Sequence, residues 1–366
     1  MEISVEIYRA TAPGINIRRP RTAATCDPPV RKRQHAVPAA ELKELRAFLL
    51  TAFRSALGLL VAAALVCVAA PAAHASALWI ADGEQVDEYL PSQLKSSGTP
   101  TPVTVSDSDQ AVGVCFDKSG NLWVTNFNEQ ILEFTAKALK KLPTAPSPAV
   151  TITSSTFSDI YGCAFDKHGN LWAADENVGV YEVSASQLKT SGSITPAVII
   201  TDTTQSPAPC YVAFDKSGNL WTDDRTNGRL FEFTASQLMS TGDKTPTVIL
   251  GGDGSLSDPG QIGFDRHGNL WVTSYSDDTV VEFSKSQLGA SNNDAPAITI
   301  SSSTLSGPWG LAFRGGDLWV MNQNNDDAEE FLPSQIKQSG SPAPSVILTD
   351  AASGSNELGF GPAHGK

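Results

Sequence analysis

The segment "FDKSGNLWV" occupies residues 116–124, and close copies begin at residue 165 ("FDKHGNLWA"), 214 ("FDKSGNLWT") and 264 ("FDRHGNLWV"). Each copy places apolar residues on both sides of a "DxxGN" centre, which predicts a β-hairpin. Asp117 is placed to accept hydrogen bonds from the amides of the turn, and Gly120 supplies left-handed backbone. A hairpin written four times indicates a repeat protein.

The repeat extends beyond these four copies. Leu-Trp pairs fall at 78–79, 122–123, 171–172, 220–221, 270–271 and 318–319, at intervals of 44 to 50 residues. A second apolar segment, such as "ILEFT", carries one glutamate in every unit: Glu88, Glu133, Glu182, Glu232, Glu282 and Glu330. A run such as "PAVTI" ends each unit, so the pattern predicts six units of four short strands.

The packing of these strands predicts how the units associate. Leu122 and Trp123 point to opposite faces of their strand, so both faces of each small sheet must be covered. A ring of six sheets covers every face. The sequence therefore predicts an all-β, six-bladed β-propeller with four-stranded antiparallel blades.

Two further features complete the predicted architecture. An "SQL" element follows the third strand of most units and predicts one helical turn with serine as N-cap, at Ser92, Ser186, Ser236, Ser286 and Ser334. The first unit, "ALWIA", lacks an "FD" strand, and residues 357–360 near the C-terminus match that missing strand. We expect the C-terminal strand to close the first blade.

The N-terminal region differs in composition from the repeats. Residues 1–45 are basic and Pro-rich, which predicts a disordered extension or a start codon assigned too far upstream. Residues 46–75 contain an apolar run and then "AHA", which predicts a signal peptide cleaved after Ala75. A retained membrane anchor is the alternative, although the run is shorter than the ~20 residues of a span. Residues 76–366 are the predicted propeller.

Net charge and cysteine content limit the partners and the cysteine roles that we expect. The chain has a net charge of −13, and residues 1–75 hold ten of its 26 basic and five of its 39 acidic residues, so the remainder carries −18. This charge excludes nucleic acid as an expected partner and favours cations such as Ca²⁺, or serves solubility alone. Cys115, Cys163 and Cys210 show no close spacing and are interpreted as buried small residues rather than a disulfide framework.

The segment "GCAFDKHGNLWAAD" and its copies resemble NHL repeats. They also resemble the wider six-bladed propeller group of gluconolactonase-like and senescence-marker-like calcium proteins, and the resemblance covers residues 77–361. "DxxGNLWV" is also similar to the repeat of streptogramin lyases. The gluconolactonase-like resemblance implies a channel metal held by a Glu-Gly-Pro glutamate, an Asn and an Asp. The lyase resemblance implies a catalytic histidine near the channel mouth.

The residues that these families use are not found at the matching positions. At the position equivalent to the channel aspartate, successive repeats of this sequence have Val112, Tyr161, Cys210, Gly260 and Trp309. No Glu-Gly-Pro occurs. His168 and His267 belong to hairpin turns, on the face opposite the usual ligand face, and His364 is near the C-terminus. The catalytic residues of neither enzyme family are recognisable.

The loops that enter the first strands vary while the strands repeat, so we expect the binding site there. Tyr161 and Trp309 share a register in opposed blades and either clamp a flat or sugar-like ligand or plug the channel. Tyr211, Gln261 and Glu357 lie one register position later and are expected at the channel mouth. Asp107, Asp109, Asp253 and Asp258 are candidate Ca²⁺ ligands, or ordinary turn residues.

Three functions follow from these observations. The first is a monomeric secreted or periplasmic scaffold that binds a small molecule, a carbohydrate or a protein. The second is a divalent-metal-dependent, lactonase-like hydrolase with a rearranged site around Glu357, or a lyase with a non-standard site. The third is a surface protein in which the ring is a spacer. The sequence favours the binding scaffold.

Overall fold

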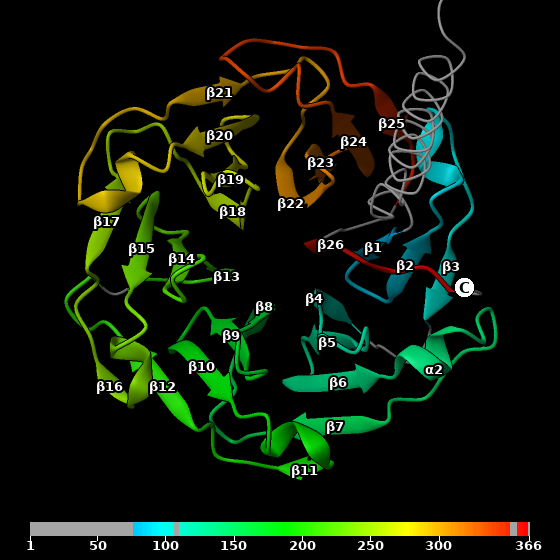
Figure 1. Cartoon of the computed structure of the whole chain (residues 1–366), viewed down its shortest axis with the longest axis vertical. Helices are drawn as coiled ribbons and strands as arrows, with labels where there is room; N and C mark the ends of the chain where they lie inside the picture. Colours follow the sequence, from blue (N-terminus) through cyan, green and yellow to red (C-terminus); the bar gives the residue numbers. More distant parts are fainter. Residues whose placement is uncertain (1–75, 106–109, 206, 352–356, 365–366) are drawn as a thin grey trace, which may run out of the picture. The chain divides into compact units, whose positions relative to one another are not determined.

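The computed structural model describes residues 76–105, 110–205, 207–351 and 357–364. Six small, mainly antiparallel sheets surround a central axis, which confirms the six-bladed β-propeller (Figure 1). The extension and signal peptide predicted for residues 1–75 lie outside the described residues. In the part of the chain that is described, no helix has the length and apolar character needed to cross a membrane.

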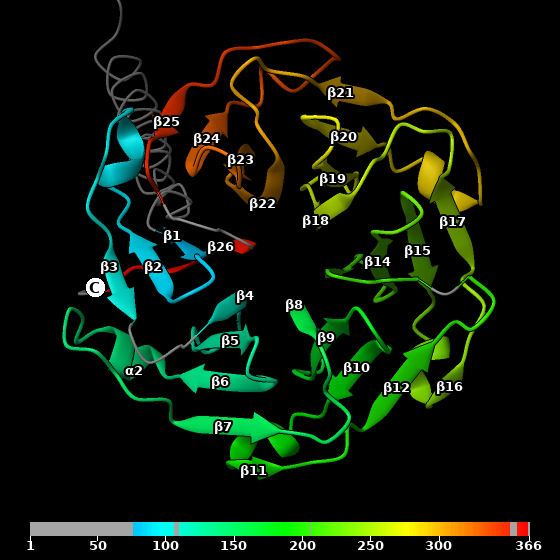
Figure 2. The same cartoon turned by 180° about the vertical axis from the view of Figure 1, so that it is seen from behind.

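Each blade runs from an innermost strand at the axis to an outermost strand at the rim (Figure 2). Blade 1 is β26 (Glu357–Pro362), β1 (Ser76–Ala81), β2 (Val86–Tyr89) and β3 (Val103–Val105). Blade 2 is β4 (Ala111–Phe116), β5 (Leu122–Asn126), β6 (Gln130–Phe134) and β7 (Val150–Thr153). Blade 3 is β8 (Ile160–Phe165), β9 (Leu171–Asp175), β10 (Gly179–Val183) and β12 (Val198–Thr201).

The second half of the ring repeats this order. Blade 4 is β13 (Val212–Phe214), β14 (Leu220–Asp224), β15 (Arg229–Phe233) and β17 (Val248–Gly251). Blade 5 is β18 (Pro259–Phe264), β19 (Leu270–Ser274), β20 (Thr279–Phe283) and β21 (Ile298–Ile300). Blade 6 is β22 (Pro308–Arg314), β23 (Asp317–Asn322), β24 (Asp327–Phe331) and β25 (Val346–Leu348).

The repeated turn forms as the sequence predicts. The Asp117 Oδ1 atom accepts hydrogen bonds from the amides of Ser119 and Asn121 at 2.8 and 2.9 Å. The Asn121 Oδ1 atom in turn accepts from the Ala136 amide, two residues beyond the end of the third strand. Gly120 has a φ of 78°, which an L side chain adopts at a cost. The turn therefore fixes both the hairpin and the path of the chain leaving strand three.

Each tryptophan of the repeat packs across a blade boundary. It shares a buried cluster with the Leu-Trp leucine of the next blade: Trp79 with Leu122, Trp123 with Leu171, Trp172 with Leu220, Trp221 with Leu270, Trp271 with Leu318 and Trp319 with Leu78. Every one of these rings also meets a phenylalanine of the next blade edge-on, with centroids 5.7–6.4 Å apart. The six interfaces therefore form one closed circuit, stabilised mainly by apolar burial.

The C-terminal strand closes the ring as predicted. β26 pairs antiparallel with β1 along its whole length, from Ser76 opposite Pro362 to Ala81 opposite Glu357. Leu358 is fully buried between blades 6 and 1. The two ends of the propeller sequence are thus held in a single sheet.

Two details of the blades add to the prediction. Blades 2 and 3 have five strands, because β11 (Gly192–Ser193) and β16 (Gly242–Asp243) each pair in parallel with the outermost strand of the preceding blade. Four of the five predicted helical turns are short 3-10 turns such as η3 (Gln187–Lys189), and their N-cap serines make no side-chain cap bond. Glutamine holds this turn instead: the Gln187 Oε1 atom accepts from the Ser184 amide at 2.9 Å.

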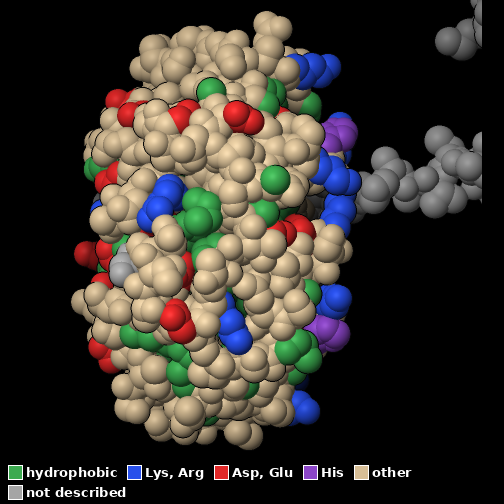
Figure 3. Space-filling view, turned by 90° about the vertical axis from the view of Figure 1, so that its left-hand side faces the viewer, with side chains coloured by type: hydrophobic (Ala, Val, Ile, Leu, Met, Phe, Trp, Pro, Cys, Tyr) green, Lys and Arg blue, Asp and Glu red, His purple; other side chains and the backbone are tan. Residues whose placement is uncertain are grey.

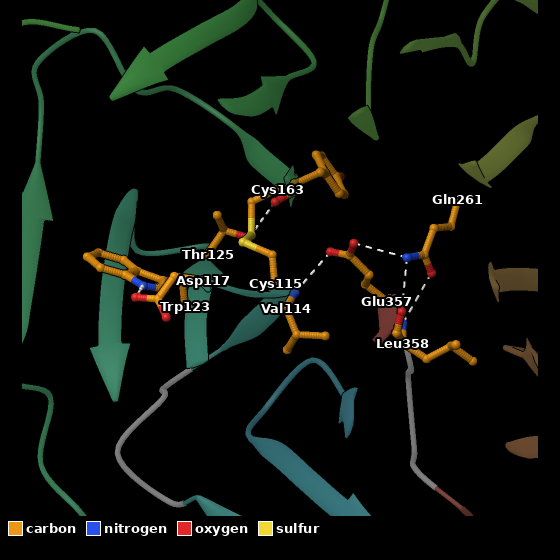
Figure 4. The surroundings of a disulfide bond; sticks show 10 residues. Val114, Cys115, Asp117, Trp123, Thr125, Cys163, Gln261, Glu357 and Leu358 are labelled. Carbon is orange, nitrogen blue, oxygen red and sulfur yellow. Dashed lines mark hydrogen bonds between the residues drawn. A yellow bond between two sulfur atoms is a disulfide. The ribbon is translucent and has the colours of Figure 1, made fainter. Parts of the chain in front are cut away.

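A disulfide joins the innermost strands of two neighbouring blades. Cys115 in β4 is bonded to Cys163 in β8, with Cα atoms 5.8 Å apart (Figure 4). The interpretation of these two cysteines as unbonded packing residues is therefore wrong, although both are buried. Cys210 is a buried free thiol, as predicted.

Candidate functional site

The channel is filled by side chains from one register position of the innermost strands. This position is two residues before the one that pairs with the repeat tryptophan, and it is held by Gly113, Gly162, Tyr211, Gln261, Gly310 and Glu357. The three large side chains are at most 8 % exposed. The glycines make room for them, because a Cβ atom on Gly162 would lie 2.4 Å from the Tyr211 ring. Three large side chains and three glycines thus fill this layer of the channel.

Two of the predicted residues form a hydrogen-bonded network across the channel (Figure 4). The Gln261 side-chain amide donates to Glu357 Oε1 and to the Leu358 carbonyl, both at 3.0 Å, and its oxygen accepts from the Leu311 amide at 2.8 Å. Glu357 Oε2 accepts from the Val114 amide at 3.0 Å. Burial raises the pKa of Glu357 well above its usual range. These contacts make the pair a connector of blades 1, 2, 5 and 6.

The two opposed aromatic residues occupy different environments. Trp309 is 3 % exposed, and its ring meets the edges of Tyr211 and Tyr275, with centroids 6.2 and 5.5 Å away. Tyr161 is half-buried and packs edge-on against Phe127, which is 44 % exposed. The geometry of Trp309 is that of a channel plug, while Tyr161 and Phe127 keep aromatic surface at the mouth.

Arg225 is the residue at this mouth that the sequence analysis missed. Its guanidinium carbon lies 4.9 Å above the centre of the Trp309 ring. Its Nε atom donates to Asp258 Oδ1 at 2.6 Å, and Nη1 lies 3.9 Å from Glu176. Arg225 therefore joins the loops of blades 3, 4 and 5 over the ring of blade 6, and its own side chain is one-third exposed.

The predicted calcium ligands do not come together in the described part of the chain. Asp258 is engaged in the ion pair with Arg225, and Asp253 Oδ1 accepts hydrogen bonds from Ser255 of its own turn. Asp107 and Asp109 lie outside the described residues. Among the described residues no group of three His, Cys, Asp or Glu side chains is arranged to hold a metal. The donor set implied by the gluconolactonase-like resemblance is therefore not matched, and Ca²⁺ stays a prediction.

The two faces of the ring differ in charge. The described lysines all lie in the strand 1–2 turns or the strand 3–4 connections, together with His168 and His267. We call this side the turn face and the opposite side the loop face. On the loop face the described basic residues are Arg225 and Arg229. Figure 3 shows Lys, Arg and His side chains gathered along one side of the molecule, with Asp and Glu more frequent toward the other.

Comparison with known proteins supports the fold. No family model and no curated protein matches this chain. A structure of a nidogen/laminin complex is 13 % identical, with a TM-score of 0.57 over 79 % of this chain and 99 % of that one. A protein of unknown function from Bacteroides caccae is 11 % identical, with a TM-score of 0.51 over 78 % of this chain and 98 % of that one. A streptogramin B lyase structure is 13 % identical, with a TM-score of 0.44 over 78 % of this chain and 81 % of that one. At these identities the two likenesses with TM-scores above 0.5 show the fold alone.

Proposed function

We propose that this protein is an exported binding scaffold whose ligand contacts the loop face at the mouth of the channel. The observation that carries the proposal is the arrangement of Phe127, Tyr161 and Arg225 around the buried Trp309. An exposed ring and a half-buried ring beside a guanidinium supply apolar, cation–π and hydrogen-bonding contacts within one surface. Because the channel is closed, the ligand binds on this surface and does not pass through the ring.

Two other observations support parts of the proposal. The disulfide between Cys115 and Cys163 is of the kind that persists in oxidising compartments, which agrees with export to the periplasm or the cell exterior. The loop face is acidic apart from two arginines, which favours ligands that are neutral or positively charged. Small molecules, carbohydrates and proteins of that charge are the candidate partners.

The lactonase-like alternative finds no support at Glu357. Its two carboxylate oxygens already accept hydrogen bonds from Val114 and Gln261 inside the closed channel. The described residues offer no further carboxylate, histidine or cysteine arranged with Glu357 to hold a metal. We therefore assign Glu357 a structural role and place binding above it.

Tyr161→Ala is expected to weaken ligand binding at least about tenfold without unfolding the protein, because a half-buried ring at an interface supplies about 1.5–3 kcal/mol when it is covered. The ligand is found first by a thermal-shift panel of calcium, other divalent ions, lactones, oligosaccharides and cationic peptides, since selective binding to the folded form raises the melting temperature. Affinities of wild type and variant are then measured by calorimetry.

Met239→Ala is the matched control, because Met239 is 80 % exposed in η4 (Gln237–Met239) on the turn face. This control should bind as wild type does. Equal affinity of all three proteins for a ligand that stabilises the fold would move the site away from the loop face. Stabilisation by a stoichiometric divalent ion alone would favour the hydrolase.

A further inference from the structure

On the turn face, clefts between blades 2 and 3, 3 and 4, and 5 and 6 are each lined by a repeat tryptophan. The strand-three glutamate lies directly opposite this tryptophan in the sheet register, for example Glu330 opposite Trp319 and Glu282 opposite Trp271. The phenylalanine of the next blade forms the other wall, at 6.3 Å from Trp319 and 6.0 Å from Trp271. The same three side-chain types therefore meet at both boundaries in nearly the same geometry.

In the cleft between blades 6 and 1 the chain itself shows which group fits these three side chains. Arg314 Nη2 lies 3.1 Å from Glu330 Oε1, and both side chains are 8 % exposed. The guanidinium carbon lies 5.4 Å from the centre of the Trp319 ring and 5.6 Å from that of Phe360. A planar cation thus pairs with the carboxylate and lies within cation–π distance of both rings, a combination that lysine cannot reproduce as well.

The cleft between blades 5 and 6 is lined by the equivalent residues Trp271, Glu282 and Phe313, but no described arginine pairs with this glutamate. The hairpin of blade 5 reads "FDRHGNLW" where blade 6 has "FRGGDLW", so Asp265 stands at the position of Arg314. Glu282 is 7 % exposed, and its carboxylate makes no hydrogen bond or ion pair with any described residue. Burial, and secondarily the nearby charge of Asp265, raise the pKa of Glu282 to about 7. The buried carboxylate lacks the compensation that buried charges usually have.

We propose that the cleft between blades 5 and 6 binds the arginine side chain of a partner polypeptide, with Glu282 pairing with the guanidinium and with Trp271 and Phe313 within cation–π distance of it. The cleft has a volume of about 300 Å³ and is lined by these residues together with Asp265, Asn269 and Ile336. This interaction is separate from the ligand proposed for the loop face, and neither depends on the other.

The basic side chains at the rim of the cleft restrict which arginine-containing partners we expect. Arg266, His267 and Lys337 line its entrance and are exposed. These cations repel a polybasic segment, while one arginine flanked by neutral or acidic residues avoids the repulsion. The related clefts at Glu133 and Glu182 repeat the pattern with half-buried carboxylates that accept no hydrogen bond from described residues. Glu232, in contrast, accepts from the Asn219 side chain at 2.7 Å.

The test is a nuclear magnetic resonance titration of the ¹⁵N-labelled protein with Nα-acetyl-arginine methylamide, which mimics an arginine within a chain. The indole N–H of Trp271 is the reporter, because it lies 3.5 Å from Asp265 Oδ2 in the cleft. We expect this signal to shift saturably with the arginine compound. Glu282→Gln should weaken the interaction at least about tenfold, the effect expected for loss of a charge-assisted hydrogen bond. The neutral isostere, Nα-acetyl-citrulline methylamide, should give no shift.

Matched variants and ligands decide the outcome. Glu232→Gln should leave the titration unchanged, and Arg314→Ala should add a shift of the Trp319 indole by freeing the equivalent cleft. Equal binding of arginine and citrulline compounds, equal binding of the lysine compound, or insensitivity to Glu282→Gln would overturn the proposal. Tighter binding of free L-arginine would overturn the choice of a polypeptide. If Glu282→Gln does not fold, the comparison of arginine with citrulline on wild type still decides.

Discussion

Removal of residues 357–366 is expected to abolish the cooperative unfolding transition of the propeller. The truncation deletes β26, leaves β1 without its inner partner, and uncovers the clusters that contain Leu358 and Ala363. It also removes Phe360 from the Trp319 ring and Glu357 from the channel network. Each large apolar side chain contributes about 1.5–3 kcal/mol, and domains are stable by only about 5–15 kcal/mol, so the loss approaches the whole stability.

Circular dichroism during heating measures this effect. Removal of Gly365 and Lys366 alone is the control and should leave the melting temperature unchanged. A soluble monomer that lacks residues 357–366 and melts as wild type does would show that the ring does not depend on its last strand.

Loss of the disulfide is the second large effect that we expect. Cys115 and Cys163 are 48 residues apart in sequence, and a cross-link that closes such a loop contributes about 2–4 kcal/mol. The double variant Cys115→Ala, Cys163→Ala should therefore unfold at lower denaturant concentration than wild type. Reductant should lower the stability of wild type by a similar amount.

The double variant also provides the control for reductant. Its stability should not respond to reductant, because Cys210 is a free thiol in both proteins. If reductant leaves wild-type unfolding unchanged, or destabilises both proteins equally, the disulfide does not carry the stability that we assign to it.

Much of the fold is predictable from the sequence because one local signal repeats. The hydrogen bonds of Asp117, the left-handed Gly120 and the two-sided burial of Leu122 and Trp123 all follow from one nonapeptide. The short parallel strands β11 and β16 were not predicted, since two-residue pairings across a blade boundary carry no periodic pattern.

The strand register explains why Cys115 and Cys163 meet. Cys115 pairs with Trp123, whereas Cys163 pairs with Ala173, one residue beyond Trp172. The one-residue offset turns the two thiols toward each other across the boundary between blades 2 and 3. A spacing of 48 residues, one less than the blade repeat of 49, was the signal in the sequence.

The site was predictable only in outline. Tyr211, Gln261 and Glu357 were expected at the channel and do converge there, although as a buried plug rather than an open lining. Arg225 was missed because its partners Glu176 and Asp258 come from other blades, 49 and 33 residues away in sequence. Contacts between loops of different blades depend on loop conformations that the repeat does not specify.

Amide hydrogen exchange is the most direct test of the central claim, that the last strand closes a ring of six blades. Peptides covering residues 76–81 and 357–362 are followed by mass spectrometry. We expect both to exchange as slowly as the Leu-Trp strands, through global unfolding alone. Rapid exchange of residues 357–362 while β5 and β9 stay protected would contradict the closed ring.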